Sequence, residues 1–242
     1  MKGCFVTGTD TEVGKTRVSA GLLHRAAQAG LRAAGYKPVA AGMDNIAGQW
    51  VNEDVHTLWA ASNIELQPEE VGPCQLRQPC APHLAAQAEG RVIDRDTLEQ
   101  GARQLAQRAD LIVVEGAGGL CVPLGPNWDS SHLMCALNLP VVLVVGLRLG
   151  CINHALLTAE AIVARRLHLA GWVGNTLDPA MLHLQDNIHT LTQEFERRFH
   201  VPCLGVVPHL ESPDAASVAP HLSTAGLQTL FGLKQPSFEV TP

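Results

Sequence analysis

The sequence predicts an α/β fold in which helices flank a mostly parallel sheet. Short apolar runs alternate with longer amphipathic stretches, 46% of the 242 residues are hydrophobic and 17% are charged, and no linker rich in glycine, serine or charge divides the chain. Buried parallel strands read as short apolar runs, and the crossovers between them are usually helical. We therefore expect a single domain over residues 1–210, followed by a tail over 211–242 that packs on it or is partly ordered against it.

In chain order, the apolar runs predict the strands and the amphipathic stretches predict the helices. The expected strands lie at residues 4–8, 33–37, 111–115, 141–146, 169–175 and 203–207. The expected helices lie at 15–29, 54–61, 95–109, 130–137, 153–167 and 181–199. Four prolines predict an irregular insertion over 68–82, and weak periodicity with many serines, prolines and alanines predicts a surface tail after Leu210.

Charge and hydropathy exclude several classes of partner. The 17 Lys and Arg residues against 23 Asp and Glu residues give a net charge of −6, which disfavours nucleic acid and anionic membranes as partners. The N-terminus lacks the apolar core of a secretion signal. The most apolar later run, 139–147, contains Pro140 and Gly146 and is shorter than the roughly 20 residues that span a bilayer. We expect a soluble, cytoplasmic protein.

The cysteines and histidines give no sign of a disulfide framework or a zinc site. The seven cysteines are odd in number and include no C-x-x-C pair, and several lie inside apolar runs. The eleven histidines include no H-E-x-x-H motif. We expect reduced thiols and no zinc.

A glycine-rich loop follows the first strand, with the sequence GTDTEVGKT over residues 8–16. In such a loop, backbone N–H groups and the positive end of the following helix converge on phosphate oxygens. Lys15 would reach the β and γ phosphates, and Thr16 would offer a hydroxyl to Mg²⁺. Five residues separate Gly8 from Gly14 where the common loop has four, so this is a lengthened phosphate-binding loop.

Two carboxylates are candidates to complete a Mg²⁺ site with Thr16. Glu115 ends an apolar strand at the carboxyl edge of the sheet, where open α/β sheets bind ligands. Asp54 lies at a helix start, where its position alone favours an N-terminal cap. Lys37 follows the second strand at the same edge, and its position is compatible with a surface or a functional role. Thr16, Asp54 and Glu115 would together suffice for Mg²⁺.

These residues resemble the dethiobiotin synthetase family. The resemblance rests on VTGTDTEVGKT at 6–16, AGYKPV at 34–39, VEGAGG at 114–119, and VVG at 144–146 with LGCINHA at 149–155. Weaker matches occur at 81–83, 169–175 and 204–208, so the resemblance spans about residues 5–210. The lengthened loop and the GCINH segment are its most specific parts.

The resemblance implies a P-loop NTPase-like fold with about seven strands, and a homodimer whose active site is shared across the interface. It implies an enzyme that uses MgATP and CO₂ to close the ureido ring of dethiobiotin from 7,8-diaminononanoate. An amine captures CO₂ as a carbamate, the carbamate attacks the γ-phosphate, and the neighbouring amine attacks the resulting carbamic–phosphoric anhydride. Phosphoryl transfer of this kind needs cations that position and neutralise the phosphate oxygens.

The resemblance also assigns roles to individual residues. Lys37, Lys15 and Thr11 would be catalytic, and Asn175 would read the adenine edge. The implied nucleotide site comprises Glu12, Val13, Gly14, Lys15, Thr16, Arg17, Asp54, Glu115, Gly116, Ala117, Gly118, Asn175, Thr176, Pro208, His209 and Leu210. The implied diamine site comprises Lys37, Ala41, Gly118, Leu149, Gly150, Cys151 and Asn153, of which the last four would bind the carboxylate of the neighbouring subunit's substrate.

Position 41 departs from the family pattern, and two other functions compete. The family commonly has a serine that contacts the diamine where this chain has Ala41.

A cobyrinate-type amide synthetase would share the loop but would need a glutamine-hydrolysing domain, for which the chain has little room. A partitioning or cell-division ATPase usually has a further lysine near the loop start, where this chain has Gly8, Thr9 and Asp10. ATP hydrolysis that depends on diamine and bicarbonate, or on DNA or lipid, would separate them.

Overall fold

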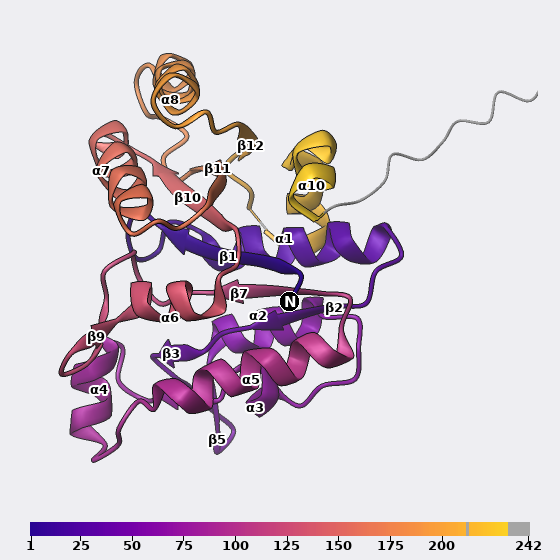
Figure 1. The fold of residues 1–242 in the computed structure, drawn as a ribbon, viewed down its shortest axis with the longest axis vertical. Coiled ribbons are helices and arrows are strands. Elements are labelled where there is room, and N and C mark those ends of the chain that lie inside the picture. The colour runs from indigo at the N-terminus through magenta and orange to yellow at the C-terminus, as the bar shows by residue number, and fades with distance from the viewer. Residues whose placement is uncertain (212, 232–242) are drawn as a thin grey trace, which may run out of the picture.

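The computed structural model describes residues 1–211 and 213–231, and within them six parallel strands form the central sheet (Figure 1). Their order is β12-β11-β10-β1-β7-β2, so the first strand lies near the centre between two strands that follow much later in the chain. All six expected strands are confirmed. Their bounds are β1 Gly3–Gly8, β2 Ala33–Tyr36, β7 Leu111–Glu115, β10 Val141–Leu147, β11 Leu169–Thr176 and β12 Cys203–Val207.

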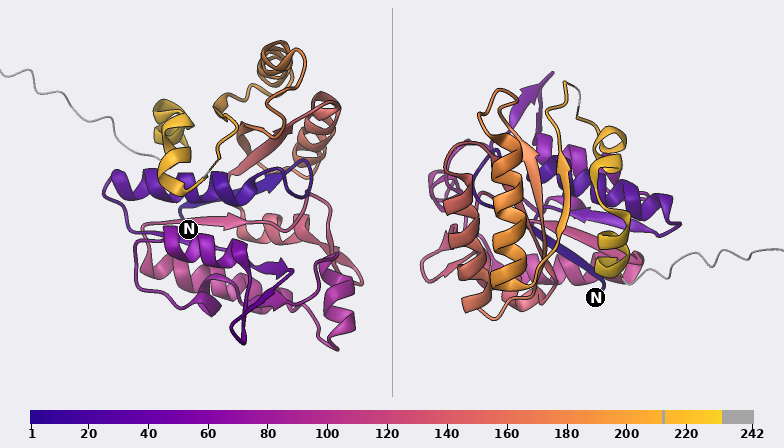
Figure 2. Two further views of the ribbon diagram at one scale, coloured as in Figure 1. Left: turned by 180° about the vertical axis from the view of Figure 1, so that it is seen from behind. Right: turned by 90° about the horizontal axis from the view of Figure 1, so that it is seen from above.

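Helices cover both faces of this sheet (Figures 1 and 2). Helices α1 and α2 pack against each other and on β2, whereas α5 packs on β2 and β7 beside α6, and α7 packs on β10 beside α8. Their bounds are α1 Lys15–Gln28, α2 Glu53–Ala61, α5 Arg95–Arg108, α6 Ser130–Leu137, α7 Cys151–Ala164 and α8 Leu184–Phe199. Each expected helix is present, and the starts and ends differ from the expectation by at most three residues.

The central sheet of the described chain has six strands, against the expected count of about seven. The chain passes from β2 through Lys37 and Pro38 into β3 (Val39–Ala41), which pairs with β6 (Cys74–Leu76) in a separate two-stranded parallel sheet. Proline has no backbone N–H to donate to a ladder, so pairing is interrupted at Pro38. Lys37 therefore lies at the junction of the two sheets.

Several short elements lie between the main strands and helices, some of them in the insertion. The insertion at 68–82 is more regular than expected, because it contains α3 (Pro68–Val71) and β6 and leads into α4 (Pro82–Ala88). Two short antiparallel hairpins were not expected at all. They are formed by β4 (Asp44–Ile46) with β5 (Gln49–Val51), and by β8 (Pro123–Gly125) with β9 (Trp128–Asp129).

The chain after Leu210 packs on the outer side of α1. It contains α9 (Ala215–Val218), a 3₁₀ turn at Ala219–His221 and α10 (Thr224–Phe231), and residues 232–242 of the expected tail lie outside the described residues. The Arg25 guanidinium donates to the carbonyl oxygens of Ala219 at 2.9 Å and Leu222 at 3.1 Å. This segment therefore braces the helix that follows the phosphate-binding loop.

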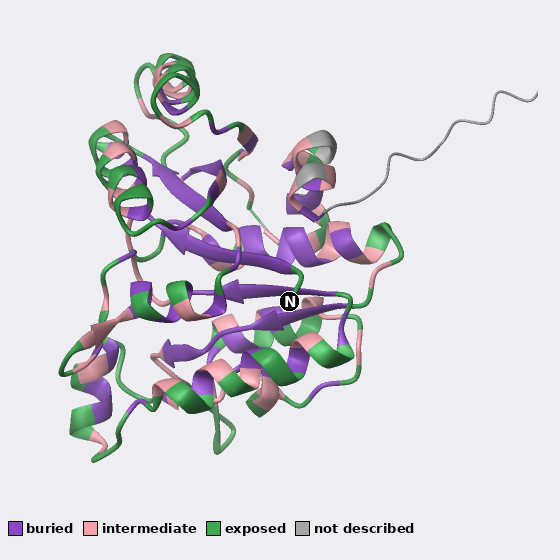
Figure 3. Ribbon diagram, viewed as in Figure 1, coloured by how far each residue is buried: buried purple, intermediate pink, exposed green. Residues whose placement is uncertain are grey.

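The core lies between the sheet and its helices. Strands β1, β7 and β10 are buried along their whole length, while the outer faces of α7 and α8 are exposed (Figure 3). Burial on both faces explains why these strands read as continuous apolar runs. Every helix of the described chain is too short or too polar to cross a bilayer. All seven cysteines are free thiols.

Candidate active site

The loop between β1 and α1 closes against the end of β11. Gly14 has a φ of 91°, and a Cβ atom at this position would lie 2.2 Å from the side-chain nitrogen of Asn175. Asn175 donates from Nδ2 to the carbonyl oxygen of Val13 at 3.0 Å. Lys15 Nζ donates to the carbonyl oxygen of Asp10 at 2.8 Å. Both the left-handed backbone and the close approach of Asn175 therefore require glycine at position 14.

Four polar side chains from different elements meet beside this loop. The hydroxyl of Thr16, on α1, lies 2.6 Å from Asp54 Oδ1 and 2.8 Å from Glu115 Oε1. Lys37 Nζ lies 2.8 Å from Asp54 Oδ2 and 2.6 Å from Glu115 Oε1, and it also donates to the Gly116 carbonyl oxygen at 3.3 Å. The structure thus brings together the three expected metal ligands and one of the two expected catalytic lysines.

Asp54 faces this cluster because another residue caps its helix. Asn52 is the N-cap of α2, and its Oδ1 accepts from the Val55 N–H at 3.0 Å. Its Nδ2 donates to the Gly42 carbonyl oxygen at 2.6 Å. The cap interpretation of Asp54 is therefore wrong.

The surroundings of the two lysines shift their pKa values in opposite directions. Burial and, next, the nearby Lys37 cation together lower the pKa of Lys15 to about 8, although neighbouring carboxylates oppose the shift. Burial also acts to lower the pKa of Lys37, but the carboxylates of Glu115 and Asp54 outweigh burial and raise it. Burial acts to raise the pKa of Asp54, but Lys37, with help from Thr16 and Lys15, outweighs burial and lowers it. Lys37 is thus a neutralised cation, whereas Lys15 forms no ion pair with a carboxylate of the described residues and suits an incoming anion.

Thr16, Asp54 and Glu115 fit a Mg²⁺ ion. Glu115 is fully buried, and its Oε2 atom has no hydrogen-bond partner in the described part of the chain. A buried carboxylate oxygen without a partner is costly unless a cation or water satisfies it. The same part of the chain contains no group of three His, Cys, Asp or Glu side chains that could hold a metal. Mg²⁺ commonly uses only one or two carboxylates together with phosphate and water, so the hydroxyl and two carboxylates suit it.

A cavity of about 1480 Å³ opens over the loop and the cluster. Most of the expected site residues line it, namely Thr11, Glu12, Gly14, Lys15, Thr16, Arg17, Lys37, Ala41, Asp54, Ala117, Gly118, Asn175, Thr176 and His209. Val13, Glu115 and Gly116 are buried behind this wall. Pro208 and Leu210 flank His209 without lining the cavity. The expected phosphate, metal and base regions therefore form one continuous surface.

The expected carboxylate-binding segment is separate from that cavity. Leu149, Gly150, Cys151 and Asn153 do not line it. Leu149 is 94% exposed, Asn153 is exposed, and Cys151 is buried at the start of α7. The preceding residue, Arg148, forms an ion pair of 2.5 Å with Asp10 of the phosphate-binding loop. The described chain thus does not place this segment in its own cavity.

Several cavity residues were not expected from the sequence. Met43 and Asp44 lead into the β4–β5 hairpin, Pro79 and Cys80 precede α4, and Cys121 lies in the loop after β7. Short hairpins with exposed strands have no apolar periodicity to reveal them. The sequence held one usable signal about this wall of the cavity. Asn52 precedes Glu53 and Asp54, and asparagine is a preferred N-cap residue, so it predicts where α2 begins.

The fold and the site define a P-loop nucleotide-binding protein. A family model described as an AAA domain matches residues 2–217. Solved structures of similar fold include MinD from Aquifex aeolicus in its MinC:MinD complex, with a TM-score of 0.56 at 13% identity, covering 98% of each chain. The cell division ATPase MinD of Pyrococcus furiosus has a TM-score of 0.53 at 15% identity, covering 96% of this chain and 97% of that one. At these identities the likeness concerns the fold alone.

A curated relative shows which family within this class the chain belongs to. The ATP-dependent dethiobiotin synthetase BioD of Aromatoleum aromaticum is 50% identical over 222 residues, which cover 92% of this chain and 97% of the relative. The chain belongs to the dethiobiotin synthetase family.

Proposed function

We propose that this protein is an ATP-dependent cyclo-ligase that converts 7,8-diaminononanoate, CO₂ and ATP into dethiobiotin, ADP and phosphate in the cytoplasm. Family membership supports the reaction. The single observation in the site that supports it best is the pairing of a phosphate-binding loop with a second lysine, Lys37, which lies within hydrogen-bond distance of both Asp54 and Glu115.

The proposed reaction has three steps. One substrate amine adds to CO₂ and loses a proton, which gives a carbamate. A carbamate oxygen then attacks the γ-phosphorus and displaces ADP, which gives a carbamic–phosphoric anhydride. The second amine attacks the carbonyl carbon of the anhydride, and phosphate leaves as the ring closes. Only the middle step transfers a phosphoryl group, and there the charge to be stabilised lies on phosphate and carbamate oxygens.

The residues of this chain suit that middle step. Lys15 would contact the β and γ phosphate oxygens, and their negative charge would stabilise the protonated form that burial disfavours. Lys37 remains a cation because two carboxylates raise its pKa, and it would hold the carbamate against the γ-phosphate. Thr11 would donate a hydrogen bond to the transferred group. Thr16, Asp54 and Glu115 would hold Mg²⁺, which neutralises phosphate charge when bound.

We also propose how the rest of the chain serves the site. Asn175 and His209 would border the adenine, with Thr176, Pro208 and Leu210 around them. The substrate carboxylate in the partner's site of a homodimer would be bound by Leu149, Gly150, Cys151 and Asn153. The start of α7 favours an anion, and these residues do not line the cavity of their own chain. Residues 1–210 would form the catalytic domain, braced by the segment that follows.

The experiment that tests the function measures phosphate release from ATP and Mg²⁺ with each addition in turn. Release is expected only when diaminononanoate and bicarbonate are both present, with dethiobiotin formed in equal amount. Release that instead depends on DNA or lipid vesicles, with no dethiobiotin formed, would favour a switch ATPase and overturn the proposal.

A further inference from the structure

The loop after β7, residues 116–122, forms one wall of the cavity and is called the glycine loop here. Its Ala117, Gly118 and Cys121 line the cavity. Gly118 has a φ of 62°, and a Cβ atom on it would lie 3.5 Å from Thr11 Oγ1. The backbone of the glycine loop therefore sets the space beside Thr11.

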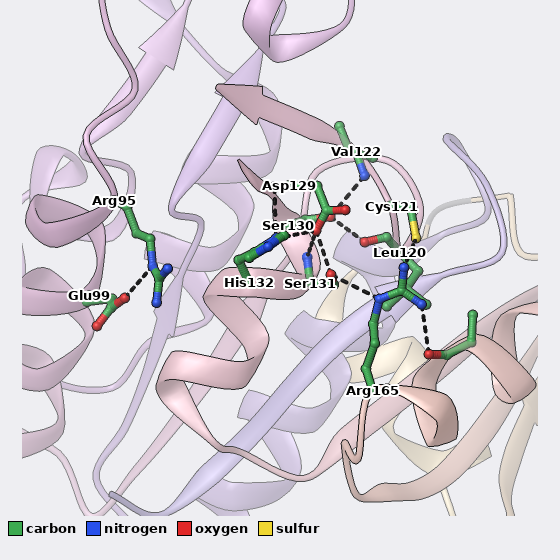
Figure 4. A network of polar contacts seen from close by, with 11 residues as sticks. Arg95, Glu99, Leu120, Cys121, Val122, Asp129, Ser130, Ser131, His132 and Arg165 are labelled. Atoms are coloured by element: carbon green, nitrogen blue, oxygen red, sulfur yellow. Dashed lines mark hydrogen bonds and ion pairs between the residues drawn. The ribbon is translucent and has the colours of Figure 1, made fainter. Parts of the chain in front are cut away.

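At its far end, the glycine loop is held by a buried serine. Ser130 is the first residue of α6 and is only 3% exposed. Its hydroxyl donates to the Leu120 carbonyl oxygen at 2.5 Å and accepts from the Val122 N–H at 3.1 Å (Figure 4). These two backbone groups lie on either side of Cys121, so one hydroxyl fixes both arms of the turn.

Helix α6 does not need this hydroxyl for its own capping. The N-cap of α6 is Asp129, whose Oδ1 accepts from the Ser131 N–H at 2.8 Å and the Ser131 hydroxyl at 2.5 Å. The Ser130 hydroxyl is thus free to bond the glycine loop, and its loss would leave the capping of α6 intact.

A second helix contacts the same turn through Arg165, at the end of α7. Its guanidinium donates from Nη2 to Cys121 Sγ at 3.2 Å and from Nε to the Ser131 hydroxyl at 3.1 Å. The remaining nitrogen donates to the Ala161 carbonyl oxygen at 3.0 Å. The planar guanidinium makes these contacts simultaneously, and a lysine ammonium at the same place could not span them.

We propose that Ser130 and Arg165 are positioning residues for the reaction, which hold the glycine loop so that Gly118 borders the diamine beside Thr11. This inference rests on the proposed function, in which Gly118 contacts the diamine. Neither residue lines the cavity, so each acts through the loop. Loss of either should weaken diamine binding more than nucleotide binding, which the phosphate-binding loop would also support, and should leave the chemical step largely intact.

The first test is Ser130→Ala, with steady-state kinetics for each substrate. We expect the KM for the diamine to rise roughly three- to tenfold, the size of one net hydrogen bond, with kcat and the KM for ATP changed less than about twofold. Ser130→Thr, which keeps the hydroxyl, should restore the KM. The matched control is Ser19→Ala, because Ser19 is also a fully buried helical serine but its hydroxyl has no partner in the described chain.

The second test uses Arg165, an exposed residue whose replacement leaves the core intact. Arg165→Met and Arg165→Lys should both raise the diamine KM, because neither side chain has the planar guanidinium that makes these contacts simultaneously. Arg166→Met removes the adjacent exposed guanidinium, for which the described contacts give no role, and should leave the KM unchanged. A diamine KM that responds to loss of charge at 166 as strongly as at 165 would overturn the proposal.

A readout without substrates separates this inference from the proposed function. Hydrogen exchange in the unliganded chain should speed up in the peptide containing Leu120–Val122 in Ser130→Ala, and stay unchanged in Ser19→Ala. If the loop amides are unaffected, or if the wild-type chain makes dethiobiotin and Ser130→Ala lowers only thermal stability, the positioning role is refuted. If exchange changes as expected but the wild-type chain makes no dethiobiotin, the function fails, and the diamine-positioning role fails with it.

Discussion

The Lys37 ammonium lies between the carboxylates of Asp54 and Glu115, and only 2% of this lysine is exposed. Because Lys37 is buried, we expect it to contribute to the stability of the fold as well as to the reaction. Removing one partner of a buried ion pair leaves the other charge without compensation. Glu115, which is fully buried, would carry most of that penalty.

Lys37→Met should therefore lose both turnover and stability. We expect kcat to fall by about 10²–10³, as when a charge-stabilising donor is removed from an active site, and the free energy of unfolding to fall by about 3–5 kcal/mol. Kinetics and urea denaturation measure the two effects. Adding Glu115→Gln should recover part of the stability and none of the turnover. A near-normal rate in Lys37→Met would remove Lys37 from the catalytic residues.

Ala41 offers a gain-of-contact test at the same scale. It is half-buried and lines the cavity, at the position where the family commonly has a serine. Ala41→Ser should lower the KM for the diamine by roughly two- to tenfold, because it adds one hydrogen bond. Ala40→Ser is the control, since Ala40 is fully buried and does not line the cavity. An unchanged or higher KM in Ala41→Ser would show that the substrate is oriented without this contact.

Single residues of the site differed in how far sequence could predict them. Thr16 and Lys15 follow from the loop pattern, and Glu115 from its place at a strand end. Asp54 could be separated from a helix cap only through Asn52, a preferred N-cap residue that does cap α2 in the structure. Ser130 and Arg165 gave no signal, because their partners, Leu120, Val122 and Cys121, are brought near them only by tertiary packing.

Among the elements, the phosphate-binding loop depends on two separate demands at Gly14. Its φ of 91° disfavours a side chain, and a Cβ atom would collide with Asn175 at 2.2 Å. Gly30, after α1, shares the first demand with a φ of 78°, but nothing lies within 4 Å of an added Cβ. Alanine at position 30 would therefore introduce backbone strain alone, whereas alanine at position 14 would introduce both backbone strain and a steric clash.

Gly30→Ala should cost about 1–2 kcal/mol of stability, the strain of a left-handed residue, and leave ATP affinity unchanged. Gly14→Ala should cost more, displace the Asn175 amide from Val13, and weaken ATP binding by roughly tenfold or more, which is at least about 1.4 kcal/mol. Thermal unfolding and titration calorimetry measure both. Equal ATP affinities in the two variants would refute the idea that Asn175 holds the loop closed.

At the element scale, the parts with strong periodicity were predictable and the short irregular parts were not. The six strands of the central sheet follow from apolar runs, because both faces of each strand are buried. The β3–β6 pair, by contrast, joins segments more than 30 residues apart through only three residues each, and Pro38 and Cys74 give no hint of that pairing. Hairpins such as β8–β9 are held by local turns and by neighbours, which a single sequence does not reveal.

For the whole molecule, the separation of Asn153 from the cavity predicts complementation between subunits. In a shared-site dimer, Asn153→Asp places a negative charge beside the carboxylate in the partner's site, while Lys37→Met disables its own. Mixing the two variants should restore about one quarter of wild-type activity at equal amounts, because half of the dimers are mixed and each has one intact site. Assays after subunit exchange measure this.

Two outcomes would contradict the shared site. If subunits exchange and the mixture stays inactive, each chain owns its complete site. If a monomeric variant keeps full activity, the partner contributes nothing. ATP affinity of Asn153→Asp serves as the internal control and should match the wild-type value, since Asn153 does not line the cavity.

The position of β1 also has a consequence during synthesis. All six residues of β1 are buried, and one of its two neighbours is β10, in which Val141 pairs with Phe5. At about 5–20 residues per second, Val141 leaves the ribosome roughly 7–30 s after Phe5. For that time β1, which is fully buried in the folded protein, has no partner on one side. Newly made chains should therefore be most prone to aggregation, and most in need of chaperone cover, until β10 has left the ribosome.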